Sequence, residues 1–315
     1  MGIGIACMLG VVALWSIVPV LVKLLIPIFD PYTIAFLRLA QGAVVVLAVF
    51  FARGHSLQDI QFCRWHLLGG LGVGLNYSMF ALSLSYTTAS AGVLIAQVQY
   101  VTLAVLAAVV LHERLGVRKI AGMVLVLIGI VAIVGMRSDV SHLLASRYAL
   151  GNVLMLFSGL GWGVYALSNK ALARRAGTLS ILTPMLTIGV AITGGLAAVH
   201  FDLYSTPTAS TLAAALVLGI LATGGAFILV SEGMKRLSAA LVGTATALAP
   251  IGQITLAHWV LGEPVTWGLA GGGVLILGGV LGIVYAERRQ PRLNNDNEPG
   301  GNQSTLRQQR ETHKR

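Results

Sequence analysis

Charged side chains are scarce in this 315-residue chain: Asp, Glu, Lys and Arg make up 10% of the residues, whereas 56% are hydrophobic. A soluble domain carries roughly 25% charged residues. Between Arg64 and Glu113 there is no Asp, Glu, Lys or Arg at all. A bilayer-spanning helix needs about 20 apolar residues, so this stretch is long enough for two spans and a turn. The composition excludes a soluble globular domain and predicts an integral membrane protein.

Cysteine is also rare. Cys7 and Cys63 lie far apart and neither belongs to a C-x-x-C pair, which argues against a metal site or a disulfide framework. No predicted span contains a His/Asp pair, a nucleophile with its base or a cluster of metal ligands, so a membrane-embedded enzyme is disfavoured. No ATP-binding motif is present either, and we expect neither a cofactor nor a metal.

Acidic residues are missing from the predicted membrane interior, because all eleven Asp and Glu fall at span ends, in loops or in the tail. Carriers of drug cations and proton relays characteristically need a carboxylate there. A multidrug-cation antiporter of that type is therefore disfavoured. Apart from Arg118 and Lys119 at the start of the fifth predicted span, Lys23 and Arg38 are the only charges within the first five predicted spans, which favours an anionic or zwitterionic solute.

The net charge of +10 could indicate a nucleic-acid binder, but its distribution argues otherwise. Seven of the 21 basic residues lie in the last 29 positions, and most of the others lie between apolar runs. This is the pattern of membrane topology. The expected partners are the lipid bilayer and a small-molecule substrate, with no nucleic acid.

Ten transmembrane helices are predicted from the charges, prolines and polar clusters that divide the chain. Their ranges are 3–25, 32–52, 67–86, 90–111, 118–136, 149–170, 178–199, 210–231, 238–260 and 265–286. The tail 287–315 is basic, has almost no apolar content and is predicted to be disordered.

The loops between these spans differ strongly in positive charge. Ten spans place both termini on one side, and that side receives nearly all basic residues outside the spans; the other side receives only Arg137 and Arg147. Positive charge stays cytoplasmic. We therefore expect cytoplasmic N- and C-termini.

An internal duplication is the strongest organisational signal. Residues 111–134 match 261–284 at nine of 24 positions with a constant offset of 150, and Trp15 and Lys23 match Trp162 and Lys170 at an offset of 147. Each half, 1–136 and 149–286, holds five spans. An odd number forces the second half to enter the membrane upside down, which is a common architecture of secondary transporters.

The duplicated pattern resembles the drug/metabolite transporter superfamily, in its EamA-type ten-helix branch. The residues that carry the resemblance are Ala81-Leu-Ser-Leu-Ser-Tyr-Thr-Thr-Ala-Ser-Ala91, Glu113-Arg-Leu and Gly122…Gly129, then Ser238-Ala-Ala240, Pro250 and Gly262-Glu263-Pro. The resemblance implies an inner-membrane exporter or permease of small metabolites, amino acids among them. One departure is Tyr100, which stands where the second half has Pro250 and where a helix-bending residue is expected.

Polar and aromatic residues inside the spans are the candidate substrate-binding residues, because polar groups there usually face the protein interior. The candidates are Trp15, Arg38, Asn76, Gln97, Tyr100, Trp162, Tyr165, Asn169 and Gln253. Arg38 has a second interpretation, as a structural donor to carbonyl groups of a broken helix. Gln97 and Gln99 point about 200° apart on a regular helix, so only one of them is expected to line a given cavity.

The leading hypothesis is a secondary transporter, expected to export small zwitterionic or neutral metabolites such as amino acids. The alternative within transport is an exchanger of anions or phosphorylated metabolites, which would need more basic residues in its cavity. We expect a monomer, with a homodimer as the alternative.

Overall fold

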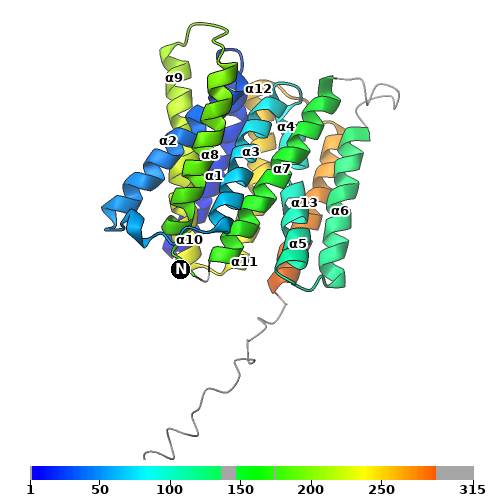
Figure 1. Ribbon diagram of the computed structural model, residues 1–315. Coiled ribbons are helices and arrows are strands. Elements are labelled where there is room, and N and C mark those ends of the chain that lie inside the picture. The colour runs from blue at the N-terminus through cyan, green and yellow to red at the C-terminus, as the bar shows by residue number, and fades with distance from the viewer. Residues whose placement is uncertain (1, 136–146, 174, 289–315) are drawn as a thin grey trace, which may run out of the picture.

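The chain folds into a bundle of helices. The computed structural model describes residues 2–135, 147–173 and 175–288, and these contain no β-strand beyond one isolated bridge between Phe29 and Leu203. The first half consists of α1 (Gly2–Leu25), α2 (Pro31–Ala52), the short η1 (Leu57–Asp59), α3 (Arg64–Leu84), α4 (Ala89–Ile95), α5 (Val98–Val110) and α6 (Val117–Gly135). The second consists of α7 (Arg147–Leu172), α8 (Thr178–His200), α9 (Ala209–Leu216), η3 (Val217–Gly225), α10 (Ala226–Arg236), α11 (Ala239–Ala247), α12 (Ala249–Leu261) and α13 (Trp267–Arg288). Figure 1 shows them side by side as one bundle.

Nine helical stretches of the described chain are long and apolar enough to cross a membrane. They agree with the first eight predicted spans and the tenth. The ninth predicted span is the pair α11 and α12, of 9 and 13 residues. The prediction of an all-helical, multi-pass membrane protein is confirmed. Residues 289–315 of the predicted tail lie outside the described residues.

Two predicted spans, 90–111 and 238–260, are each interrupted near their middle. α4 ends at Ile95 and α5 begins at Val98, while α11 and α12 meet at Leu248. At both breaks a backbone hydrogen bond joins residues three apart, whereas a regular α-helix joins residues four apart. The Gln99 N–H donates to the Ala96 carbonyl at 3.0 Å, and the Ile251 N–H donates to the Leu248 carbonyl at 3.1 Å. Irregular backbone at membrane depth is tolerated where protein buries it or where it lines a cavity.

A third irregularity lies in the eighth span. α9, η3 and α10 run on without a break, but η3 is a π-helix of nine residues. A π-helical turn holds more residues than an α-helical one and occurs most often at functional sites. The Thr223 side chain reflects the wider turn, because its Oγ1 donates to the Leu218 carbonyl five residues back, at 2.9 Å.

Glycines bring two helix pairs into close contact. α6 and α13 cross where a Cβ on Gly122 would lie 2.7 Å from the Gly279 carbonyl oxygen, and one on Gly129 equally close to that of Gly272. Small residues four or seven apart let helix backbones approach closely. The same device joins α3 to α7. These crossings fix the outer pairs of helices around the interior.

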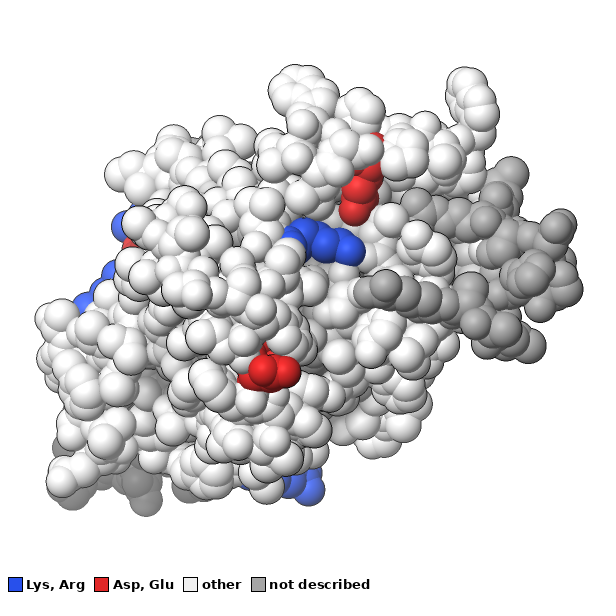
Figure 2. Space-filling view, turned by 90° about the horizontal axis from the view of Figure 1, so that it is seen from above, with Lys and Arg blue, Asp and Glu red and all other residues white. Residues whose placement is uncertain are grey.

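The two ends of the bundle differ in charge. At the end where α1 begins and α13 finishes (Figure 1), Glu232 forms ion pairs with Arg53 at 2.8 Å, with Lys235 at 3.0 Å and with Arg236. Figure 2 shows the opposite end, whose surface carries few charged side chains. There Asp30 caps α2 by accepting from the Tyr32 and Thr33 amides.

Candidate functional site: a central cavity

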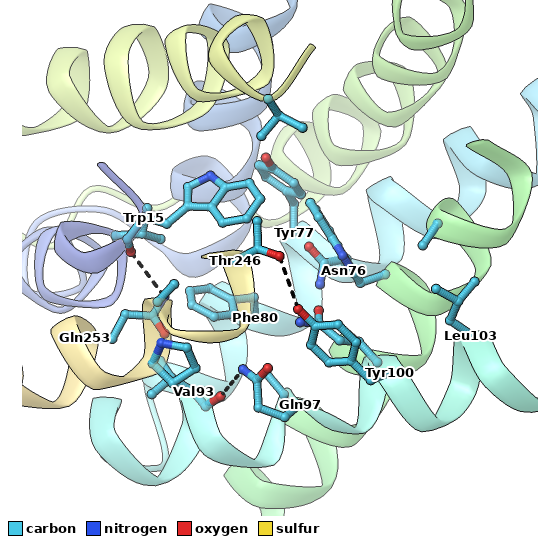
Figure 3. Close-up of a pocket in the computed structure, with 18 of the residues that line it drawn as sticks. Trp15, Asn76, Tyr77, Phe80, Val93, Gln97, Tyr100, Leu103, Thr246 and Gln253 are labelled. Atoms are coloured by element: carbon cyan, nitrogen blue, oxygen red, sulfur yellow. Dashed lines mark hydrogen bonds between the residues drawn. The ribbon is translucent and has the colours of Figure 1, made fainter. Parts of the chain in front are cut away.

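A cavity of about 310 Å³ lies inside the bundle, where both broken helices face α1, α3 and α7 (Figure 3). Its wall comes from both halves of the chain. The lining residues are Trp15, Val18, Arg38, Asn76, Tyr77, Phe80, Val93, Ala96, Gln97, Gln99, Tyr100, Leu103, Trp162, Ala166, Phe227, Val230, Val242, Thr246, Ala249, Pro250 and Gln253. Among these residues Arg38 carries the single formal charge.

Seven of the nine candidate residues line this one cavity: Trp15, Arg38, Asn76, Gln97, Tyr100, Trp162 and Gln253. Tyr165 and Asn169 do not. Tyr165 is 6% exposed and packs behind the wall, with its ring 4.9 Å from Trp162 and 6.2 Å from Phe227. Asn169 donates to the Tyr165 carbonyl at 3.1 Å and lies against the Met185 sulfur, toward α8. Their assignment to substrate binding stays a prediction, and neither residue lines this cavity.

Arg38 is held by three neighbours. Its Nε donates to Thr223 Oγ1 at 3.1 Å, and the carbon of its guanidinium lies 4.4 Å from the ring centre of Tyr77 and 5.6 Å from that of Phe80. Cation–π contacts of this kind stabilise a guanidinium more strongly when water is excluded. The structural role expected for Arg38, donation to carbonyls of a broken helix, is therefore replaced by a bond to the hydroxyl of the π-helix.

The break between α4 and α5 presents both glutamines to the cavity. Gln97 and Gln99 both line it, so the expectation that only one would do so is wrong. The 200° separation assumes a regular helix, and the helix is interrupted at this point. Gln97 donates through Nε2 to the Val93 carbonyl at 2.8 Å, which leaves its side-chain oxygen as an acceptor.

The two broken helices are linked across the cavity. Tyr100 from α5 and Thr246 from α11 place their hydroxyl oxygens 3.4 Å apart, and Gln253 from α12 donates to the Trp15 carbonyl at 3.1 Å (Figure 3). Tyr100 thus takes the place of a helix-bending proline without preventing the break. Its hydroxyl ties one break to the other.

Asn76 joins the wall to α7. Its Nδ2 donates to both the carbonyl oxygen and the hydroxyl of Ser158, each at 2.9 Å. These bonds use both of its amide hydrogens. What Asn76 can still offer a solute is its carbonyl oxygen, as an acceptor.

Aromatic rings make up much of the remaining wall. The Trp15 and Trp162 ring centres lie 6.1 Å apart at an interplanar angle of 87°, an edge-to-face contact. Trp162 also stacks on Phe227 at 6.4 Å and 13°. Such rings combine a large apolar area with a single N–H donor in each indole. The cavity can therefore take an apolar body beside hydrogen-bonding groups.

Four further residues of the wall are not among the candidates from the sequence: Tyr77, Phe80, Phe227 and Thr246. One signal was available for Phe227: it lies 150 positions after Tyr77, the offset of the internal repeat. Thr246 could not be singled out, because a threonine in a span usually bonds its own helix. Thr246 does so too, donating to the Val242 and Gly243 carbonyls.

The charged residues at the span ends serve contacts between helices. Glu263 accepts the Ala89 and Ser90 amides at 2.7 and 2.8 Å, so it caps α4 from another part of the chain. Glu113 pairs with Lys170 at 2.9 Å. Lys23 donates to the Thr87 carbonyl at 2.6 Å. None of the four lines the cavity.

Apolar helices around a partly polar cavity define a multi-pass membrane protein with room for one small solute. The chain belongs to the EamA-like transporter family, whose model matches residues 2–135 and again 149–285. It is therefore a membrane transporter of the drug/metabolite type.

Named relatives agree with this class. An uncharacterized transporter of Archaeoglobus fulgidus is 27% identical over 85% of this chain and 92% of its own length. The aromatic amino acid exporter YddG of Ancylobacter novellus is 28% identical over 82% and 89% of the two chains. The uncharacterized inner membrane transporter YhbE of Escherichia coli is 24% identical, and the match spans about three fifths of each chain, 59% and 60%.

The fold is similar to a solved protein crystal structure. The TM-score is 0.64 at 22% sequence identity, and the match covers 91% of this chain and 98% of that one. At this identity the likeness concerns the fold alone.

Proposed function

We propose that this protein is a secondary transporter that exports small zwitterionic or neutral metabolites, amino acids with apolar side chains among them. The observation that carries the proposal is the cavity itself, which joins one cation, several amide and hydroxyl groups and a cluster of aromatic rings. At about 310 Å³ it stands at the lower end of ligand pockets, which run from about 300 to 1,000 Å³. It suits a solute of amino-acid size.

Two further observations support amino acids. The wall contains no carboxylate among its described residues, and a carrier of organic cations would use one. The relative YddG is named as an aromatic amino acid exporter. Aromatic side chains would find matching surfaces on Trp15, Trp162 and Phe227.

Inverted five-helix halves are part of the proposal, and the crossing of α6 with α13 supports them. The repeat offset of 150 carries Gly122 to Gly272 and Gly129 to Gly279. The close approaches are Gly122 to Gly279 and Gly129 to Gly272, so each contact becomes the other when the halves are exchanged. The contacting glycines also follow in opposite order along the two helices, since Gly122 precedes Gly129 whereas its partner Gly279 follows Gly272. Halves of opposite orientation require this order.

Other equivalent positions behave alike. His112 and Gly262, again 150 apart, have positive φ angles of 55° and 68° at the ends of the fourth and ninth spans. Trp15 and Trp162, 147 apart, touch each other. Residues that meet their own repeat equivalents lie close to a two-fold axis, which runs in the membrane plane in transporters with inverted repeats.

An exchanger of anions or phosphorylated metabolites is the alternative. A phosphate group carries up to two charges and is usually bound by several Arg or Lys side chains. The described cavity wall supplies Arg38 alone. This observation favours a solute with at most one negative group that needs neutralising.

The proposal places the protein in a bacterial inner membrane as a monomer, with both termini cytoplasmic. The clustering of Arg53, Lys235 and Arg236 at the end of the bundle where α1 begins supports this orientation. Five spans in each half can enclose a cavity without a second copy, which supports the monomer.

Counterflow into proteoliposomes tests the function. Vesicles loaded with an unlabelled amino acid should accumulate the same labelled amino acid from outside, and a panel should include L-phenylalanine, L-leucine, a sugar and a sugar phosphate. We expect accumulation with the apolar amino acids. Accumulation only with the sugar phosphate would favour the alternative, and none with any solute would contradict the proposal.

A further inference from the structure

Arg38 is a half-buried cation with which no carboxylate of the described residues forms an ion pair. It lies seven residues into α2, which at 1.5 Å per residue is about 10 Å below the start of the helix. Among the described residues no Asp or Glu forms an ion pair with it, and Thr223 is its one hydrogen-bond partner. An arginine inside a membrane protein costs free energy unless a partner satisfies it.

The contacts of Arg38 leave one side of the guanidinium open. Nε is fixed by Thr223, whose hydroxyl is itself tied to Leu218 in the π-helix, and the plane is held by the Tyr77 and Phe80 rings. No described residue accepts a hydrogen bond from the terminal Nη1 and Nη2 groups, while the side chain lines the cavity. The pair of donors that recognises a carboxylate in bidentate fashion is therefore without an acceptor among the described residues.

The two halves contribute unlike chemistry at equivalent positions. The offset of 150 pairs Gln99 with Ala249 and Tyr100 with Pro250, all four on the cavity wall. In these two pairs the first half supplies the polar side chain, whereas in Ala96/Thr246 and Leu103/Gln253 the second half does. Equivalent positions on the wall therefore differ in chemistry, although the two halves are related by duplication.

The two halves also differ in charge at one pair of equivalent positions. The offset of 147 carries Arg38 to Met185, which is fully buried and packs against Gly69. A solute thus meets one cationic group, on the side of α2. The cationic Arg38 and the aromatic residues of the wall therefore offer different chemistry to the two ends of an amphipathic solute.

We propose that Arg38 is the subsite for the carboxylate of the transported solute, with the apolar part of that solute against Trp162, Phe227 and Val230. This inference rests on the proposed transport function and adds to it the residue that binds the carboxylate of the solute. It commits the substrate class to monocarboxylates with an apolar body, zwitterionic amino acids included. Amines and amides of the same shape should bind more weakly.

The first test changes the ligand and leaves the protein intact. Calorimetric titration of the purified wild-type protein should compare L-phenylalanine with L-phenylalaninamide, which keeps the ring and the amine and lacks the carboxylate. Hydrogen bonds to a charged group predict binding of the acid about 10- to 100-fold tighter than the amide. Equal binding of the two ligands overturns the subsite and leaves the transport function standing. Binding of neither, with no counterflow, would count against the proposed function itself.

The second test changes the residue. In Arg38→Gln the preference for the acid should fall to about onefold, while affinity for the amide stays within about twofold of wild type. Arg38→Lys keeps the positive charge but loses the paired N–H donors of the guanidinium, and it should retain part of the preference for the acid over the amide. The matched control is Thr223→Val, which removes the Nε bond and leaves the charge, and should still prefer the acid. A preference that survives in Arg38→Gln, or one that Thr223→Val abolishes equally, would overturn the assignment.

Discussion

At the scale of single residues, the sequence located most of the polar groups of the wall because membrane-buried polar groups are few. Seven candidates lie around one cavity, since a buried polar side chain in a span has few places to go other than the interior. Tyr165 and Asn169 do not line the cavity. Tyr165 is rotated 60° from Trp162 on a helix of 3.6 residues per turn, and Asn169 lies about two turns further along. Spacing alone does not tell how far a cavity extends along a helix face.

Trp162 offers the residue-scale prediction. It touches Trp15, Tyr165 and Phe227 and still lines the cavity, so removal of the indole should take away solute contacts. We expect Trp162→Ala to lower counterflow of L-phenylalanine at least about tenfold, equivalent to about 1.4 kcal/mol of lost binding, with membrane insertion unchanged. Trp162→Phe should retain a measurable part of the activity.

The control for Trp162→Ala is Val44→Ala, because Val44 on α2 is 66% exposed on the outside of the bundle. It should transport as well as wild type. Normal counterflow by Trp162→Ala would assign the indole to packing alone. So would misfolding of both Trp162 variants in size-exclusion profiles.

At the scale of secondary-structure elements, hydropathy predicted where the spans lie and missed how three of them are built. The break at Gln97 has no proline or glycine beside it, so no local signal marks it. The break at Leu248 is followed by Pro250, which lacks a backbone N–H. The π-helix at Val217–Gly225 has two glycines at its end, but its register depends on the bond from Thr223 to Leu218. These irregularities follow from packing around the cavity.

The glycine crossing of α6 and α13 gives the element-scale prediction. A Cβ at Gly129 would lie 2.6 Å from the Ile276 side chain, whereas nothing lies within 4 Å of one at Gly278 on the same pair of helices. Gly129→Leu should destabilise the protein by about 1–3 kcal/mol through overpacking. The Tm in detergent should fall clearly below that of Gly278→Leu. Equal Tm values for the two variants would show that the backbones need not approach closely.

At the scale of the whole molecule, the proposed transport depends on the two halves having opposite orientation. One cavity can then open to each side of the membrane in turn. Composition alone predicted a multi-pass membrane protein, since so few charges cannot cover a water-facing surface. The duplication predicted the inversion from an odd number of spans in each half. The location of the cavity between the halves needed three dimensions, because its wall combines residues as distant as Trp15 and Gln253.

Gly116 and Thr266 allow the most direct measurement of this inversion. They are exposed, lie 150 positions apart and precede α6 and α13, and a Cβ at Gly116 meets nothing within 4 Å. With Cys7 and Cys63 replaced by Ser, single cysteines at the two sites should be labelled with a membrane-impermeant maleimide in right-side-out and inverted vesicles. The account predicts that Gly116→Cys reacts only from the cytoplasmic side and Thr266→Cys only from the outside. Reaction of both from the same side would contradict it.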